Sequence, residues 1–425
     1  MSTVLLSYEE AAALVADHSA RLRPLHPVME RVDLAQAAGR TLARPLYADH
    51  DQPPFARSTR DGFACRAREA STHLPLPIAG ATRAGQPPAG PLPQGAAWEI
   101  MTGAPIPDGA DAVMMIEHVE AGAGSVRLLP PRSLDVGENV VPQGAQARAG
   151  DELLPVGTAV TFAQIALAAS CGCTTLDVYA RPRVAILSTG DELVPIDSEP
   201  GLGQIRNSSS PMLAEMVAAA GGDPWILPTS ADREEALDAA LARAADADLL
   251  LITGGVSAGK FDLVEPALAR AGARFHFTGI RIQPGKPLVF GEMPRKANES
   301  RSANEEPATL PIFGLPGNPV SSAVTFLLFA APVLGALAGR RDAVPRFALA
   351  RLSSAPGKRA KGGLTRFLPA RCTFGAAPDT FPEVELVPWQ GSGDLTALAR
   401  SNCFLVLSDD DQPLDAGSIV RILLP

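Results

Sequence analysis

The polar and apolar positions near the start of the chain predict a helix that begins just after residue 7. Ser7 and Glu10 have the spacing of a capping box, in which each side chain accepts a hydrogen bond from the other residue's backbone amide. Apolar residues then recur with the period of a helix. The same box recurs at Thr161 and Gln164, so a second helix is predicted there, ending near Gly172.

Two other stretches contain short apolar runs that are broken by proline and glycine. The first covers residues 47–143 and predicts a small β-rich domain. Because helical segments flank it, we expect a helical arm of residues 1–46 and 144–180 into which this domain is inserted. The second stretch, residues 345–425, predicts a C-terminal β-barrel-like domain.

Residues 181–340 alternate between buried strands and amphipathic helices. The expected strands are residues 184–187, 225–227 and 249–253. One helix is expected to begin at Ser210, before a proline, and another at Asp232, where Glu235 completes a third capping box. This alternation predicts an α/β domain with a parallel-type sheet that binds its ligand at the carboxyl ends of the strands.

A nearly uncharged run over residues 320–339 is long enough to span a bilayer. Early serines and Pro332 interrupt it, and Asn318-Pro319 is a helix-start signal. We therefore predict a buried helix in a large core or a dimer interface. The polar residues 294–308, just before this region, are predicted to form a mobile hairpin insertion.

Composition narrows the class of protein. A chain of 425 residues favours two to four domains, and the net charge of −9 argues against a nucleic-acid partner. The five cysteines have no zinc-ligand spacing, which fits a reducing compartment, and the first ten residues have no signal-peptide pattern. A soluble cytoplasmic protein is expected. An anionic substrate would have to be held by backbone amides and a few cations.

Glycine- and proline-rich turns follow the expected strands of the α/β domain. Their residues are 189–192 (TGDE), 253–259 (TGGVSAG), 284–287 (PGKP) and 314–319 (GLPGNP). Glycines let backbone N–H groups approach an anion, and helix N-termini add positive potential. The turns alone are weak signals, and carboxylates among them give them chemical meaning.

Glu192 and Asp262 are placed to hold Mg²⁺ against a phosphoanhydride. Asp262 could instead only cap the following helix, and Asp232 could likewise be only a cap. Lys286 could be a solvated lysine, although its flanking prolines favour a directed role. Asp61 lies in an Asp-Gly pair that is ordinarily just a turn.

Taken together, these motifs resemble the molybdopterin molybdenumtransferase (MoeA) family, to which the C-terminal domain of gephyrin is related. The resemblance runs from about residue 7 to the C-terminus. Besides the turns above, it rests on residues 53–55 (PPF), 61–64 (DGFA), 101–105 (MTGAP), 137–140 (GENV) and 391–393 (GSG). Each motif is short, but the ordered set is highly specific.

The resemblance implies an elongated homodimer and a Mg²⁺-dependent reaction in which molybdate and adenylylated molybdopterin give molybdenum cofactor and AMP. Asp61 and Thr102 would approach from one subunit and the α/β pocket from the other. The implied catalytic residues are Asp61, Glu192, Asp262 and Lys286, with Glu192 and Asp262 as metal ligands. The implied substrate-binding residues are Thr102, Thr189, Gly190, Asp232, Gly254, Gly255, Ser257, Gly259, Pro316, Gly317, Asn318, Pro319 and Ser392.

Two departures remove charge near the expected cleft. Gln283 stands where members usually have lysine, and residues 141–146 (VPQGAQ) replace a charged segment. The alternatives are therefore a non-catalytic paralogue that acts as a pterin- or protein-binding scaffold, and an α/β domain with other nucleotide chemistry. Other cofactor-biosynthesis proteins and acceptor molybdoenzymes are expected partners.

Overall fold

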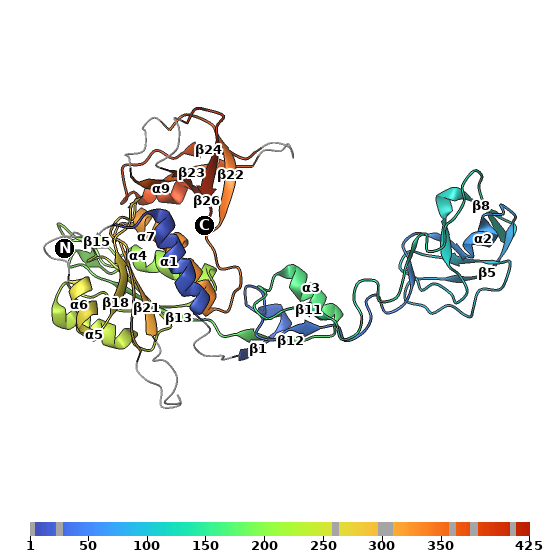
Figure 1. The fold of residues 1–425 in the computed structure, drawn as a ribbon, viewed down its shortest axis with the longest axis horizontal. Helices are drawn as coiled ribbons and strands as arrows, with labels where there is room; N and C mark the ends of the chain where they lie inside the picture. Colours follow the sequence, from blue (N-terminus) through green and yellow to red (C-terminus); the bar gives the residue numbers. More distant parts are fainter. Residues whose placement is uncertain are drawn as a thin grey trace.

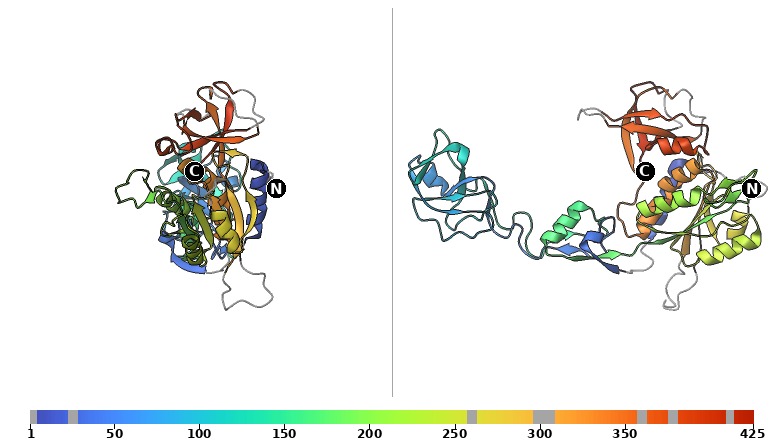
Figure 2. Two further views of the ribbon diagram at one scale, coloured as in Figure 1. Left: turned by 90° about the vertical axis from the view of Figure 1, so that its left-hand side faces the viewer. Right: turned by 180° about the vertical axis from the view of Figure 1, so that it is seen from behind.

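The computed structural model describes residues 5–22, 29–256, 263–295, 309–356, 363–374, 381–408 and 414–425. The molecule is elongated (Figure 1). An α/β unit and a C-terminal barrel lie together at one end, a narrow arm leads away from them, and a β-rich unit lies at the far end of the arm. The view from behind shows the same separation (Figure 2).

A six-stranded sheet forms the centre of the α/β unit. In spatial order its strands are β16 (Asp223–Ile226), β13 (Arg183–Ser188), β17 (Leu249–Thr253), β21 (Thr309–Leu315), β20 (Val289–Pro294) and β18 (Arg274–Thr278). The first four are parallel, and β20 and β18 run antiparallel to their neighbours. The sheet is therefore mixed, with a parallel part that includes all three strands expected from the sequence.

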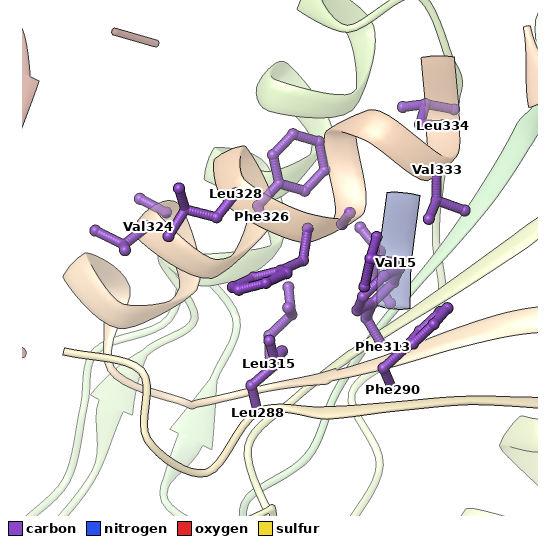
Figure 3. Packing of buried hydrophobic residues seen from close by; sticks show 14 of the residues in the cluster. Val15, Leu288, Phe290, Phe313, Leu315, Val324, Phe326, Leu328, Val333 and Leu334 are labelled. Carbon is purple, nitrogen blue, oxygen red and sulfur yellow. The ribbon is translucent and has the colours of Figure 1, made fainter. Parts of the chain in front are cut away.

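Helices cover both faces of this sheet. One face packs against α1 (Tyr8–Arg21), α4 (Ser209–Ala219), α7 (Pro319–Thr325), η3 (Phe326–Ala330) and α8 (Ala331–Leu337). The other packs against α5 (Glu234–Ala244) and α6 (Val264–Arg270). Figure 3 shows the first core, where Phe290 and Phe313 stack with their ring centroids 4.6 Å apart. The fold class predicted for this unit is confirmed.

The apolar run after residue 319 is a core helix. Pro319–Leu337 is helical throughout, and 83% of its most apolar window is buried, although it is long and apolar enough to cross a membrane. The π-helical turn η3 ends just before Pro332. Because proline has no N–H and its ring crowds the preceding turn, the widened turn accommodates it without ending the helix. The prediction of a buried helix is confirmed.

Two of the predicted helix starts are formed as expected, and two differ. Both capping boxes, at Ser7 and at Thr161, are formed. At Asp232 the prediction is wrong, because α5 begins at Glu234 and no side chain caps it. The helix predicted near Ser210 is present. The backbone N–H of Ser210 donates a hydrogen bond to the side chain of Asn207, three residues earlier, which caps the start of the helix.

The arm contains one helix, α3 (Phe162–Ser170), and the short helix η1 (Leu34–Gln36). Two antiparallel strand pairs complete it: β1 (Met29–Asp33) with β12 (Thr175–Tyr179), and β2 (Leu46–Tyr47) with β11 (Glu152–Leu154). The first helix expected in the arm, α1, packs elsewhere, because its apolar face is buried in the core of the α/β unit. The other expected domain boundaries stay predictions.

The remote β-rich unit is a second six-stranded sheet. Its strands in spatial order are β7 (Ala112–Met115), β4 (Gly62–Cys65), β6 (Ala97–Ile100), β5 (Leu76–Thr82), β9 (Ser125–Leu128) and β8 (Val119–Gly122). The pair β3 (Arg57–Ser58) and β10 (Val140–Val141) and the short helices α2 (Ala67–Ala70) and η2 (Ile116–His118) accompany it. It has its own apolar clusters, apart from those of the α/β unit.

The C-terminal unit is a closed barrel, as predicted. Its ring consists of β23 (Thr365–Thr373), β24 (Glu383–Leu386), β22 (Phe347–Leu352), β26 (Ile419–Leu423) and β25 (Cys403–Leu407), which pairs back to β23. Helix α9 (Leu395–Arg400) lies beside it. The short strand β19 (Ile282–Gln283), from the α/β unit, pairs in parallel with β23 and so joins the two units.

Candidate active site

A cavity of about 790 Å³ lies at the carboxyl ends of β13, β17 and β21. This is the edge where the sequence placed the ligand. Of the residues predicted to bind substrate or metal, those that line the cavity are Thr189, Glu192, Gly254, Gly255, Pro316, Gly317, Asn318 and Pro319. Three separate turns are therefore brought together by the parallel pairing of their strands.

The Gly254-Gly255 turn lies directly against Thr189. Gly254 has a φ of +94°, and a Cβ added there would lie 2.3 Å from the carbonyl oxygen of Thr189. At Gly255 a Cβ would lie 2.9 Å from the Thr189 hydroxyl oxygen and 2.8 Å from Cγ2 of Val264. Only glycine fits this backbone. The N–H of Gly254 donates to the carbonyl oxygen of Leu315 at 3.4 Å, so Gly255 is the residue of this turn whose amide could face a ligand.

Two helix N-termini reach the cavity. Asn318 precedes Pro319, the first residue of α7, and Ser208 and Ser209 at the start of α4 line the same space. The Ser209 hydroxyl lies 3.5 Å from the carbonyl oxygen of Gly317, so the two helix starts lie next to each other on the cavity wall. The helix dipoles at such ends attract anions, although the N–H groups of Val320 and Ser210 already donate to the Ser392 carbonyl and the Asn207 side chain.

Carboxylates gather on one side of the cavity. Glu192 lines it, and its side chain folds back over Gly190, where an added Cβ would lie 2.5 Å from a carboxylate oxygen. Asp191 accepts a hydrogen bond from the backbone of Asp232 at 3.1 Å. Burial, followed by the charges of Asp191 and Glu192, raises the pKa of Asp232. Of these three carboxylates only Glu192 lines the cavity, and an oxygen ligand of this kind suits a hard cation such as Mg²⁺.

The C-terminal unit closes part of the pocket. Gly393 and Leu395 line it. Ser392 does not, but its hydroxyl accepts a 2.9 Å hydrogen bond from the side-chain amide of Asn318. Its carbonyl also accepts from the backbone N–H of Val320 at 3.0 Å. Residues 391–393 (GSG) thus hold the start of α7 in place.

Asp61 and Thr102 lie together but far from this cavity. One carboxylate oxygen of Asp61 accepts hydrogen bonds from Thr102, from the backbone N–H at 2.6 Å and from the hydroxyl at 2.8 Å. These two bonds lower the pKa of Asp61. Both residues belong to the β-rich unit at the far end of the arm (Figure 1), and neither lines the cavity. Within one chain the two halves of the expected site are apart.

The remaining described residues of the predicted site do not line the cavity. Lys286 is exposed and is not part of the cavity wall, although its neighbour Pro287 is. Gln283 is exposed too and pairs in register with Arg366 of the barrel. Gly190 and Asp232 do not line the cavity. Ser257, Gly259 and Asp262, like residues 296–308 of the expected hairpin insertion, lie outside the described residues.

The sequence interpretation missed one wall of the cavity. It is formed by β14 (Leu193–Val194), β15 (Ile205–Arg206) and the segment between them, including Pro200 and Gln204. Arg206 brings a cation to this wall, and its Nε donates to the carbonyl oxygen of Ser198 at 2.9 Å. The available signal was the helix start at residues 207–210 (NSSS), because a helix N-terminus after a strand is itself an anion site.

Three family models match consecutive parts of the chain. The MoeA N-terminal region (domain I and II) matches residues 6–172, a probable molybdopterin binding domain matches residues 185–336, and the MoeA C-terminal region (domain IV) matches residues 354–424. The cavity lies mainly within the second match. Its remaining wall, at Gly393 and Leu395, lies within the third.

Curated relatives and solved structures agree with these matches. A molybdopterin molybdenumtransferase of Synechococcus elongatus is 34% identical and covers 99% of both chains. One of Haemophilus influenzae is 33% identical over 94% of both. The crystal structure of a molybdopterin biosynthesis MoeA protein from Pyrococcus horikoshii is 27% identical, with a TM-score of 0.78 over 99% of this chain and 100% of that one.

Proposed function

Because this chain belongs to the molybdopterin molybdenumtransferase (MoeA) family, a family of transferases in molybdenum cofactor biosynthesis, we propose that it inserts molybdate into adenylylated molybdopterin and releases AMP. The observation that carries the proposal is the cavity itself. Two helix N-termini and a glycine turn surround it, and Glu192 lies on its wall. Such a site suits a substrate whose negative charge is concentrated in a phosphoanhydride.

The binding roles follow from the geometry of the wall. The starts of α4 and α7 and the Gly254-Gly255 turn would hold phosphate oxygens, and Arg206 would add a positive charge. The volume of about 790 Å³ is in the range of sites for small organic molecules. The enzyme's main contribution would be to hold pterin, adenylate and molybdate in reacting positions.

Glu192 would hold Mg²⁺, together with Asp262 by the family motif and with Asp191 and Asp232 close by. When bound, the cation supplies charge neutralisation at the anhydride. The carboxylates are then a requirement for binding the metal and not an obstacle to an anionic substrate. Lys286, which is exposed and precedes the wall residue Pro287 in the chain, would contribute a further cation.

The distant pair Asp61 and Thr102 supports a homodimer with a shared site. Asp61 is exposed and its carboxylate is held by two hydrogen bonds from Thr102, but neither residue lines the cavity of its own chain. In a two-fold dimer the β-rich unit of each subunit would face the cavity of the other. We also propose that the protein is cytoplasmic. Its partners would be other cofactor-biosynthesis proteins and acceptor molybdoenzymes.

The decisive experiment incubates purified protein with adenylylated molybdopterin, Mg²⁺ and molybdate and measures AMP. We expect AMP and inserted molybdenum to appear in equal amounts, and both to require Mg²⁺. The competing function is a non-catalytic scaffold, favoured by the loss of charge at Gln283. Tight pterin binding without AMP release under any of these conditions would establish the scaffold and reject the enzyme.

A further inference from the structure

Three metal-ligating side chains converge at the edge of the central sheet that lies away from the cavity. They are His18 on α1, His276 on β18 and Glu292 on β20, and one ligand atom of each lies within 4.8 Å of the others. Among the described residues this is the one group of three or more histidines, cysteines or carboxylates so arranged. None of the three lines the active-site cavity.

Both histidines have a buried nitrogen without a hydrogen bond, and that of His276 lies 4.0 Å from a carboxylate oxygen of Glu292. The Nε2 atoms of His18 and His276 are inaccessible to solvent and make no hydrogen bond. Leaving such atoms unsatisfied costs roughly 1–3 kcal/mol each. The ring centroids lie 5.1 Å apart, and His18 packs edge-on against Phe290. The aromatic packing fixes both rings, so neither nitrogen is free to turn toward water.

The carboxylate of Glu292 lies beside the two histidines and contacts two other side chains. The hydroxyl of Thr309 donates to one of its carboxylate oxygens at 3.0 Å. The other oxygen is 2.8 Å from the Arg274 guanidinium. Arg274 has 75% of its side chain exposed, whereas Glu292 has 14%. Because an exposed arginine gives up such an ion pair at little cost, this oxygen can be released to a metal.

The protonation states suit a cation. Burial lowers the pKa of His18 and that of His276, a direction that favours the neutral imidazole. Neutral imidazole is the form that binds metals. Glu292 then supplies the one negative charge inside the cluster, and the facing arginines, Arg21 and Arg274, belong to its exposed rim.

We propose that His18, His276 and Glu292 bind one divalent transition-metal ion of the Zn²⁺ type, which fastens α1 to the edge of the sheet. Two imidazoles and a carboxylate with water as the fourth ligand form a known zinc-ligand set. With metal–ligand bonds of about 2.0–2.1 Å, tetrahedral ligand atoms lie roughly 3.3 Å apart. The side chains must therefore close by roughly 1.5 Å at most from the 4.8 Å limit.

The bound ion would act on the fold and not on the reaction. His18 is in the last turn of α1, whose apolar face is buried in the α/β core. His276 and Glu292 lie on the two antiparallel strands at the end of the sheet. A metal shared by these elements therefore cross-links the N-terminal helix to the sheet edge. It binds only the folded chain and so raises its stability.

Zn²⁺ titration of the metal-free, full-length protein, with Mg²⁺ in excess to occupy the active site, tests the proposal. We expect one tight Zn²⁺ per chain, a higher Tm, and visible Co²⁺ absorption of four-coordinate type. His18→Gln, His276→Gln and Glu292→Gln should each weaken binding at least about 100-fold. Thr309→Val should weaken it roughly 10- to 100-fold, as for other groups that only orient a ligand.

The matched control is His50→Gln, at a half-buried histidine beside Asp49, which should leave the tight site intact. Circular dichroism and the metal-free Tm report whether each variant folds, and any one folded ligand variant suffices for the comparison. Failure of the wild type to bind stoichiometric Zn²⁺, or unchanged affinity in a folded ligand variant, would overturn the proposal. The Co²⁺ spectrum of the wild type decides independently if all three variants misfold.

Discussion

The side-chain amide of Asn318 donates a 2.9 Å hydrogen bond to the hydroxyl of Ser392, which joins the start of α7 to the barrel. The two residues are 74 positions apart in the chain. Because Asn318 also lines the cavity, the bond couples the position of the barrel to the shape of the site. The C-terminal unit thus helps to form the cavity.

Removing this bond should loosen substrate binding more than it slows chemistry. Ser392→Ala and Asn318→Ala should each raise the KM for adenylylated molybdopterin severalfold and change kcat little, since a neutral hydrogen bond contributes about 0.5–1.5 kcal/mol. If the bond is the cause, the double variant should be no worse than the worse single one. Fully additive effects in steady-state kinetics would show that the residues act separately.

Gly254→Ala should be strongly destabilising and inactive. Its Cβ would lie 2.3 Å from a backbone oxygen, in a conformation with φ of +94°. Overpacking and the left-handed backbone together cost about 3 kcal/mol or more. The control is Gly203→Ala, at a φ of +82° with nothing within 4 Å of the added atom, which should cost only about 1–2 kcal/mol. Equal denaturant midpoints for the two variants would contradict the close-approach argument.

Glu192→Gln should reduce kcat/KM for AMP release by about 100-fold, or about 2.7 kcal/mol, because the amide cannot neutralise a cation. The Mg²⁺ concentration for half-maximal activity should rise as well. Glu199→Gln is the matched control, because Glu199 is exposed in the same segment and does not line the cavity. Normal Mg²⁺ dependence in the Glu192 variant would remove this residue from the metal site.

Asp232 should make stability depend on pH in a defined direction. Its pKa is raised by burial and by the charges of Asp191 and Glu192. A raised pKa contributes stability at pH values below the ordinary value, and that contribution is lost as pH rises through the raised value. Asp232→Asn should therefore increase Tm at neutral pH and lose this advantage near pH 3. Saturating Mg²⁺ should shrink the difference, and a variant less stable than wild type at pH 7 would refute the sign.

A shared active site predicts complementation between two inactive proteins. Asp61→Ala and Glu192→Gln should each be nearly inactive alone. After subunit exchange, heterodimers would contain one intact site, giving on the order of a quarter of wild-type activity for random mixing. Exchange is verified by native mass spectrometry. If heterodimers form and AMP release stays at the level of the separate proteins, the two residues do not meet across subunits.

The sequence determined the features that depend on neighbours along the chain. Capping boxes at Ser7 and Thr161 and the buried helix after Asn318 follow from spacing of polar and apolar side chains. Glycine turns at strand ends also followed, because parallel strands place their carboxyl ends on one edge. Turns that are far apart in the sequence could therefore be assigned to one site from the sequence alone.

Only the tertiary structure decided which surfaces meet. The helix of Ser7 packs on the α/β unit and not on the arm, and Asp232 faces carboxylates instead of capping a helix. The wall at Arg206 and the cluster of His18, His276 and Glu292 join elements whose local patterns do not refer to one another. Such contacts arise from collective burial of apolar surface, which is non-directional, so residue spacing alone does not encode them.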